Sequence, residues 1–151
     1  YFFLSPLNSV RESSLRFSRS IPNYINIVDS TYRGLNNTDL PLKVIKGKTD
    51  LGRTLILYPG ASPFAEEHPS MIFLGAVLAN TGFNVYIPRI PLLKDLDISE
   101  KNVEWFQNAY NQLLNRDDIK NTIVHIILLL IITILSSPLY HNLYFMICNR
   151  K

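Results

Sequence analysis

Residues 47–54 come close to the pattern of a phosphate-binding loop. They read Gly-Lys-Thr-Asp-Leu-Gly-Arg-Thr, with Arg53 at the position where that pattern has lysine. A phosphate-binding loop must lead into the N-terminus of a helix, because the backbone N–H groups there bind the anion. Here an apolar run rich in β-formers, residues 54–58, follows instead. We therefore predict a β-turn between two strands.

A second group of chemically active side chains is Glu66-Glu67-His68. Two carboxylates and an imidazole can hold a metal ion or act as an acid–base pair. Adjacent loop residues point in different directions, however, and the other histidines, His125 and His141, lie far along the chain. We therefore interpret the group as acidic residues at the start of a helix, where negative charge is favourable.

The glycine and cysteine positions exclude several common sites. The six glycines stand at 34, 47, 52, 60, 75 and 82, and no two are four residues apart. The Gly-x-Ser-x-Gly nucleophile elbow is therefore absent, and so is the Gly-x-Gly-x-x-Gly dinucleotide fingerprint. The single cysteine, Cys148, excludes an internal disulfide framework and a cysteine-rich zinc site. We expect no cofactor and no metal.

The middle of the chain predicts a strand, a helix and a second strand. The apolar run at residues 54–58 is typical of a buried strand and is closed by Pro59-Gly60. A helix with a broad apolar face starts at Pro69 and stops near Gly82. Residues 84–87 then form the next strand, before Pro88. A strand–helix–strand unit of this kind is right-handed and makes a parallel sheet.

Flanking segments extend this unit. Residues 42–45 predict a short strand, and a helix is expected to begin after Ser99 as its N-cap, with Glu100 in the first turn. Residues 119–127 have the apolar character of another buried strand. The predicted fold class is α/β: a partial three-layer α/β/α sandwich with a mostly parallel sheet.

Residues 54–116 resemble the N-terminal half of an α/β-hydrolase of the dienelactone-hydrolase-like and esterase-like superfamily. The resemblance is carried by residues 55–63 (LILYPGASP), by residues 66–69 (EEHP) and by residues 78–89 (LANTGFNVYIPR). In that family a strand ends in His-Gly and turns into the oxyanion loop, and a helix and a further strand follow. This chain has Pro59 in place of the family's histidine and Arg89 where aspartate is frequent.

The resemblance implies hydrolysis of an ester or related acyl bond in a small-molecule substrate by a serine nucleophile. It also implies that Gly60, Ala61 and Ser62 are the oxyanion-hole candidates, with the backbone N–H of Ala61 as one donor. Small residues at these positions leave room for a substrate. The alternative interpretation is that Gly60-Ala61 only makes a tight turn.

The family's nucleophile is expected near residues 127–132, which read Ile-Leu-Leu-Leu-Ile-Ile and contain neither serine nor glycine. Ser136 and Ser137 lack flanking glycines, and no acidic residue follows residue 118. The family's order of nucleophile, acid and histidine therefore cannot be built. We assign no catalytic residue and predict that this 151-residue chain is inactive.

The last part of the sequence differs from the rest. Residues 121–149 contain no Asp, Glu, Lys or Arg. One interpretation, which we favour, is a truncated or frame-shifted hydrolase, in which residues following His125 are out of frame. The other is a membrane-associated tail through 123–147, which would make the chain a non-enzymatic, membrane-anchored α/β module. The run 123–135 is shorter than the roughly 20 apolar residues that a membrane span needs.

Three zones follow from these patterns. Residues 1–40 are a lead-in segment, residues 41–120 the N-terminal half of the hydrolase-like domain, and residues 121–151 the apolar tail.

Lys and Arg number 15 against 12 acidic residues, a net charge of +3 that is too mild to indicate a nucleic-acid partner. We expect a cytoplasmic location, or a membrane-associated one if the tail is native. Residues 36–38 (NNT) fit a glycosylation sequon, a pattern that also arises by chance.

Overall fold

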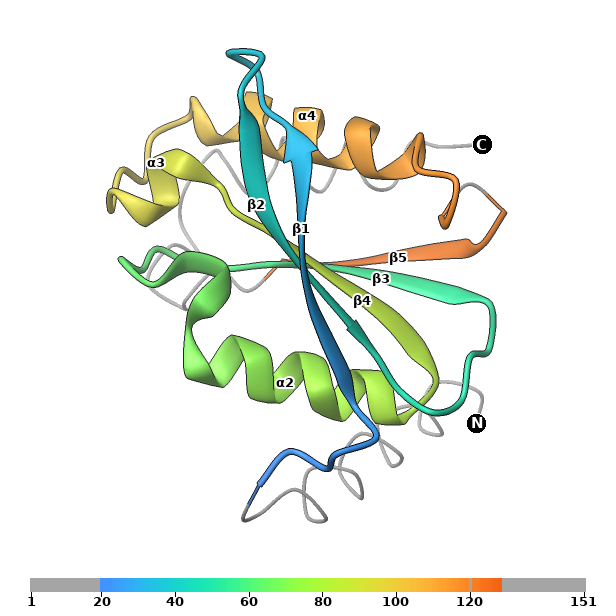
Figure 1. Cartoon of the computed structure of the whole chain (residues 1–151). Coiled ribbons are helices and arrows are strands. Elements are labelled where there is room, and N and C mark those ends of the chain that lie inside the picture. The colour runs from blue at the N-terminus through green and yellow to red at the C-terminus, as the bar shows by residue number, and fades with distance from the viewer. Residues whose placement is uncertain (1–19, 120, 129–151) are drawn as a thin grey trace, which may run out of the picture.

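The computed structural model describes residues 20–119 and 121–128 (Figure 1). Its strands are β1 (Asn26–Arg33), β2 (Asp39–Lys46), β3 (Arg53–Tyr58), β4 (Phe83–Pro88) and β5 (Ile123–Leu128). Its helices are η1 (Ala65–Glu67), α2 (Pro69–Asn80), α3 (Pro91–Lys94) and α4 (Asn102–Leu114). The α/β class that we predicted is confirmed.

The sheet is mixed, with the strand order β1-β2-β4-β3-β5. β4, β3 and β5 are parallel to one another, whereas β2 runs antiparallel to both β1 and β4. Our prediction of a mostly parallel sheet is therefore inexact. A short hairpin loop joins β1 to β2, and such a loop can connect only antiparallel strands, whereas α2 provides the crossover that parallel β3 and β4 need.

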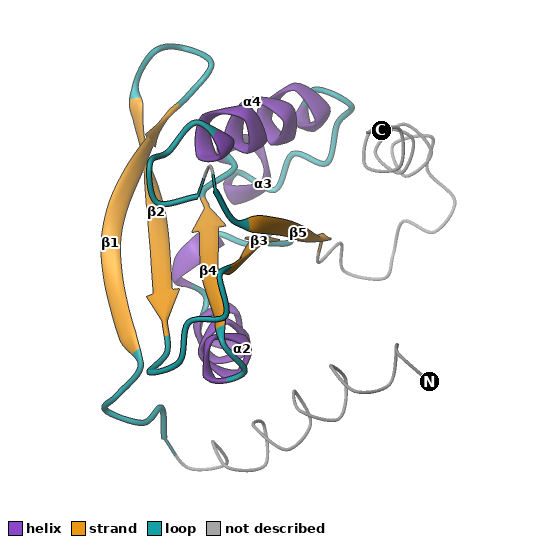
Figure 2. Cartoon of the chain, turned by 90° about the vertical axis from the view of Figure 1, so that its right-hand side faces the viewer, coloured by secondary structure: helices purple, strands orange, loops and turns teal. Residues whose placement is uncertain are grey.

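Helices cover both faces of the sheet, with α2 on one face and α3 and α4 on the other (Figures 1 and 2). β3 shows how the layers are filled: Leu55 and Leu57 pack toward α2, and Ile56 and Tyr58 pack toward α4. Alternate residues of a strand point to opposite faces, so a strand buried on both faces must be apolar throughout. The three-layer arrangement that the sequence predicts is present.

The start and end of α2 agree with the sequence signals. Pro69 occupies the first turn, and the imidazole Nδ1 of His68 caps the helix by accepting a hydrogen bond from Ser70 N at 3.2 Å. Gly82 has φ 98°, a left-handed conformation that favours glycine after a helix end. The predicted β3–α2–β4 unit is thus confirmed.

Other boundaries differ from the predictions. β1 and the first residues of β2 lie within the segment that we assigned as a lead-in, so the sheet begins before residue 41. α4 begins at Asn102, because Ser99 lies in a turn closed by hydrogen bonds from Asn102 Nδ2 to the carbonyls of Asp97 and Ser99. β5 begins at Ile123, and Ile119 is instead buried in the preceding turn.

Several sequence-based interpretations fall outside the described residues. These include everything we inferred for residues 129–151, and with them Ser136, Ser137, His141 and Cys148. The apolar run starting at 123 is described only through residue 128, where it forms β5. None of the helices within residues 20–119 and 121–128 is long and apolar enough to span a bilayer.

Candidate active site

The loop between β3 and α2, residues 59–68, lies at the carboxyl edge of the parallel strands. β3 ends at Tyr58 and β5 ends at Leu128, and these two residues are paired in the register of the sheet. The chain segments that leave β3 and β5 therefore start from adjacent positions.

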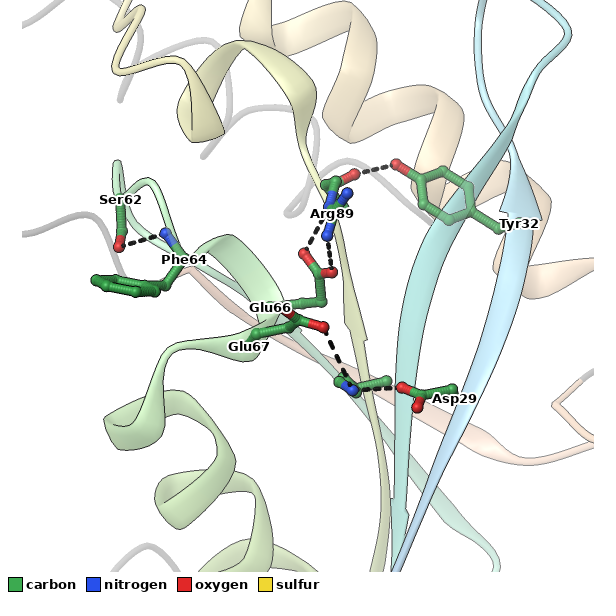
Figure 3. Close-up of polar contacts among 8 residues, drawn as sticks. Asp29, Tyr32, Ser62, Phe64, Glu66, Glu67 and Arg89 are labelled. Carbon is green, nitrogen blue, oxygen red and sulfur yellow. Dashed lines mark hydrogen bonds and ion pairs between the residues drawn. The ribbon is translucent and has the colours of Figure 1, made fainter.

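The three oxyanion-hole candidates differ in their surroundings. The backbone N–H of Ser62 donates to Leu93 O in α3 at 3.1 Å, so this amide is not available to a substrate in this conformation. Ser62 Oγ accepts a hydrogen bond from Phe64 N at 3.2 Å (Figure 3). Gly60 and Ala61 are half-buried, and Ala61 packs against the core on the α4 side of the sheet.

A buried ion pair anchors the second half of the loop. Glu66 is fully buried in η1, and both of its carboxylate oxygens accept hydrogen bonds from Arg89, which follows β4. The distances are 2.9 Å from Nε to Oε2 and 2.6 Å from Nη2 to Oε1 (Figure 3). This is the bidentate geometry that makes arginine–carboxylate pairs both strong and directional.

Glu66 and Glu67 do stand in the first turn of a helix, but this helix is η1 and not α2, which we predicted to begin there. Glu66 lies before the cap of α2, and its partner is the side chain of Arg89, directly after β4. One sequence signal could have indicated this contact: Arg89 is a basic residue directly after a buried strand. A basic residue beside the core needs an acidic partner, and the loop supplies it.

Arg89 also joins the loop to the first two strands. Its backbone N–H donates to Pro41 O at 3.0 Å, and its carbonyl accepts a short hydrogen bond from the hydroxyl of Tyr32.

The hydrogen bond from Arg89 to Glu66 raises the pKa of the Arg89 guanidinium. Burial, and then the negative charge of Glu66, raise the pKa of Tyr32 far above its usual value, so its hydroxyl stays a donor.

A groove of about 300 Å³ lies beside this ion pair. It is lined by Asp29, Ser30, Thr31, Pro41, Leu42, Lys43, Glu66, Glu67 and Arg89. Lys43 bridges Asp29, through a short contact, and Glu67, at 3.7 Å, and the hydrogen bond with Asp29 is the main reason that the pKa of Lys43 is raised. Each charged group that lines the groove thus has an opposite charge beside it.

A further polar cluster holds the segment that leads into β5. Asp118 accepts hydrogen bonds from the Tyr86 hydroxyl at 2.9 Å and from Arg116 Nε at 3.0 Å. Burial alone would raise the pKa of Asp118, but these hydrogen bonds outweigh burial and hold the pKa below its usual value. Because Tyr86 belongs to β4, the cluster ties the approach of β5 to the centre of the sheet.

The other sequence motifs that we considered do not form sites here. Residues 47–52 are the connection between β2 and β3, and Asp50 Oδ1 accepts a hydrogen bond from Gly52 N at 2.8 Å, as in a turn. The segment links two strands, as predicted, and does not lead into a helix. Within residues 20–119 and 121–128 no three His, Cys, Asp or Glu side chains gather in a way that would hold a metal ion.

No protein-family model and no curated protein sequence matches the chain. Among solved structures, a brefeldin A esterase described as a bacterial homologue of human hormone-sensitive lipase is 16% identical with a TM-score of 0.39, over 57% of this chain and 28% of the esterase. A prolyl endopeptidase is 14% identical with a TM-score of 0.44, over 70% of this chain and 17% of the endopeptidase. The chain therefore matches less than a third of the length of either protein.

Proposed function

We propose that residues 20–128 form the oxyanion-loop half of a serine hydrolase that acts on an ester or a related acyl bond of a small molecule. The register between β3 and β5 carries the proposal. Residues 123–125, which precede the proposed change of frame, already pair in parallel with residues 53–55, so β5 runs alongside β3 toward the loop at 59–62. A nucleophile placed there would face the loop's backbone N–H groups, as acyl transfer requires.

In this proposal the N–H of Ala61 stabilises the oxyanion that develops on the substrate carbonyl. Ser62 has a supporting role, because its own N–H holds the loop to Leu93 O. A preorganised donor of this kind contributes about 3–4 kcal/mol to the transition state. The half-buried position of Ala61 restricts competition from water.

We further propose that this 151-residue chain does not catalyse the reaction. Residues 127–132 are Ile-Leu-Leu-Leu-Ile-Ile, and no serine or cysteine occurs among them. Without a nucleophile and its histidine, the oxyanion loop has no reaction to assist. The full chain is expected to show no hydrolysis of short-chain p-nitrophenyl esters and no covalent labelling by a fluorophosphonate.

The test uses a second protein, made from the same DNA but translated after His125 in the reading frame that encodes Gly-x-Ser-x-Gly. We expect this chain to be labelled by the fluorophosphonate, and the Ala61→Pro variant, which lacks the N–H, to react roughly 10²–10³ times more slowly. The matched control is Pro63→Ala, which keeps the N–H of Ala61. Equal labelling rates for Ala61→Pro and the unaltered chain would refute the role of Ala61.

The alternative function is a non-enzymatic module anchored to a membrane through residues 123–147. The observation that favours it is the absence of charged residues from 121–149. Residues 123–128 are committed to β5, however, so an anchor would have to begin after them. Flotation of the full chain with phosphatidylcholine vesicles is the test: we expect the protein to stay at the bottom of the gradient, and flotation would favour the anchor. The hydrolase proposal does not depend on the cytoplasmic location that we expect from the sequence.

A further inference from the structure

The hairpin tip between β1 and β2 has a fixed conformation. Gly34 N donates to Thr38 O at 2.8 Å, and Asn37 N donates to Gly34 O at 3.0 Å. Asn37 has φ 62°, a left-handed conformation that asparagine tolerates better than most residues. Arg33 Nη1 adds a hydrogen bond to the carbonyl of Asn37 at 2.8 Å. The turn is thus held by its own backbone and by one side chain.

Within this turn the side chain of Asn36 has a defined orientation. Its Oδ1 accepts hydrogen bonds from Thr38 Oγ1 at 2.7 Å and from Thr38 N at 3.4 Å. A backbone N–H can only donate, so the oxygen of the carboxamide must face Thr38 and the Nδ2 group must face away. Both residues are exposed, and within the part of the chain that the structure describes Nδ2 forms no hydrogen bond.

We propose that Asn36 is an acceptor site for N-linked glycosylation. Asn36-Asn37-Thr38 is the one Asn-x-Ser/Thr sequon in the sequence, and the fold sets it at an exposed tip with its Nδ2 toward solvent. The co-reactant is an oligosaccharide carried on a lipid diphosphate. A bond forms between Nδ2 and the anomeric carbon of the sugar, the anomeric C–O bond breaks, the lipid diphosphate leaves with the electron pair, and Nδ2 loses one proton to solvent.

The position of the tip makes a glycan compatible with the fold. The β1–β2 hairpin projects beyond the helices in both views (Figures 1 and 2). Below the tip, Asn108 of α4 donates from Nδ2 to Arg33 O at 2.9 Å, and this contact does not involve Asn36. A glycan on Asn36 therefore displaces no core side chain and no residue of the loop at 59–68. Because such sequons are used in secreted proteins, glycosylation in cells would replace the cytoplasmic location.

The experiment treats the purified full chain with an oligosaccharyl transferase and a lipid-linked oligosaccharide, and measures the intact mass. Asn36→Gln and Thr38→Ala remove the acceptor and the hydroxyl. Asn37→Gly is the matched control, because it keeps both the sequon and the positive φ. A peptide of residues 33–39 reports whether the enzyme accepts the local sequence without the fold.

We expect the full chain and Asn37→Gly to gain the mass of one oligosaccharide, and the other two variants to gain none. Peptide N-glycosidase is expected to remove the glycan and leave a carboxylate at position 36. The proposal is overturned if the peptide is modified while the folded chain is not, since the hairpin would then block the reaction. It is equally overturned if neither is modified, or if Asn36→Gln still gains the glycan.

Discussion

Replacing Arg89 with methionine leaves the carboxylate of Glu66 buried without its partner. The side chain of Glu66 is 1% exposed, whereas that of Arg89 is 24% exposed. Methionine keeps most of the aliphatic length of arginine, and the backbone hydrogen bonds of residue 89 to Pro41 and Tyr32 do not depend on the side chain. The substitution therefore isolates the loss of the ion pair.

The expected cost is about 3–5 kcal/mol in the free energy of unfolding, the range for removing one partner of a buried pair. Glu66→Gln is expected to cost less, about 1.5–3 kcal/mol, because the arginine that it leaves behind still reaches water. The double variant Glu66→Leu/Arg89→Met buries no charge and should recover much of the loss of Arg89→Met. The control Glu67→Gln breaks an exposed contact with Lys43 and should cost under about 1 kcal/mol.

Equilibrium unfolding in urea, followed by circular dichroism, measures all four variants against the unaltered chain. The slope of the transition must stay constant for the comparison to hold. The stabilising role of the ion pair is contradicted if Arg89→Met loses no more stability than Glu67→Gln, or if the double variant is less stable than Arg89→Met. Either result would mean that Glu66 does not depend on Arg89 for its burial.

Three further predictions concern other contacts of the fold. Tyr32→Phe removes the hydroxyl that donates to Arg89 O and should cost about 1 kcal/mol in urea unfolding, whereas no loss would show that water replaces it. Gly47→Ala puts a Cβ 2.3 Å from the backbone oxygen of Ala79, and should cost about 1–3 kcal/mol; unchanged stability would contradict this close packing. Asp118→Asn should be less stable than the unaltered chain above pH 3.8, where the Asp118 carboxyl of the unfolded chain is charged. The difference in stability between the two proteins should shrink as the pH falls through the lower pKa that Asp118 has in the folded state. A difference that is constant down to about pH 2 would contradict that prediction.

The elements predicted from sequence are those with strong local signals. Pro69 and Gly82 mark the ends of α2 because each has a backbone preference that fits only such a position. Residues 55–58 of β3 are an unbroken apolar run because both faces of the strand are covered there. β1 is not predicted because it is an edge strand: Ile27 and Val28 are exposed, and only Tyr32 is buried.

The parts that could not be predicted depend on contacts between distant residues. Glu66 and Arg89 are separated by 23 positions, and no periodicity links a loop carboxylate to the residue after a strand. β2 runs antiparallel because a hairpin joins it to β1, and β1 has too few buried apolar residues to be predicted as a strand. The orientation of Asn36 is likewise a property of the folded turn, since the sequon alone does not state where Nδ2 points.

The hydrolase proposal requires a nucleophile in the residues that continue the chain after His125 in another reading frame. The most direct measurement is to sequence the source DNA from the codon of Asn115 onward and to read all forward frames. The hydrolase proposal predicts that one frame continues β5 into Gly-x-Ser-x-Gly, with an acidic residue and a histidine further on. If the frame that encodes Ile-Leu-Leu-Leu-Ile-Ile at 127–132 is confirmed and no frame contains that motif, the hydrolase proposal is contradicted.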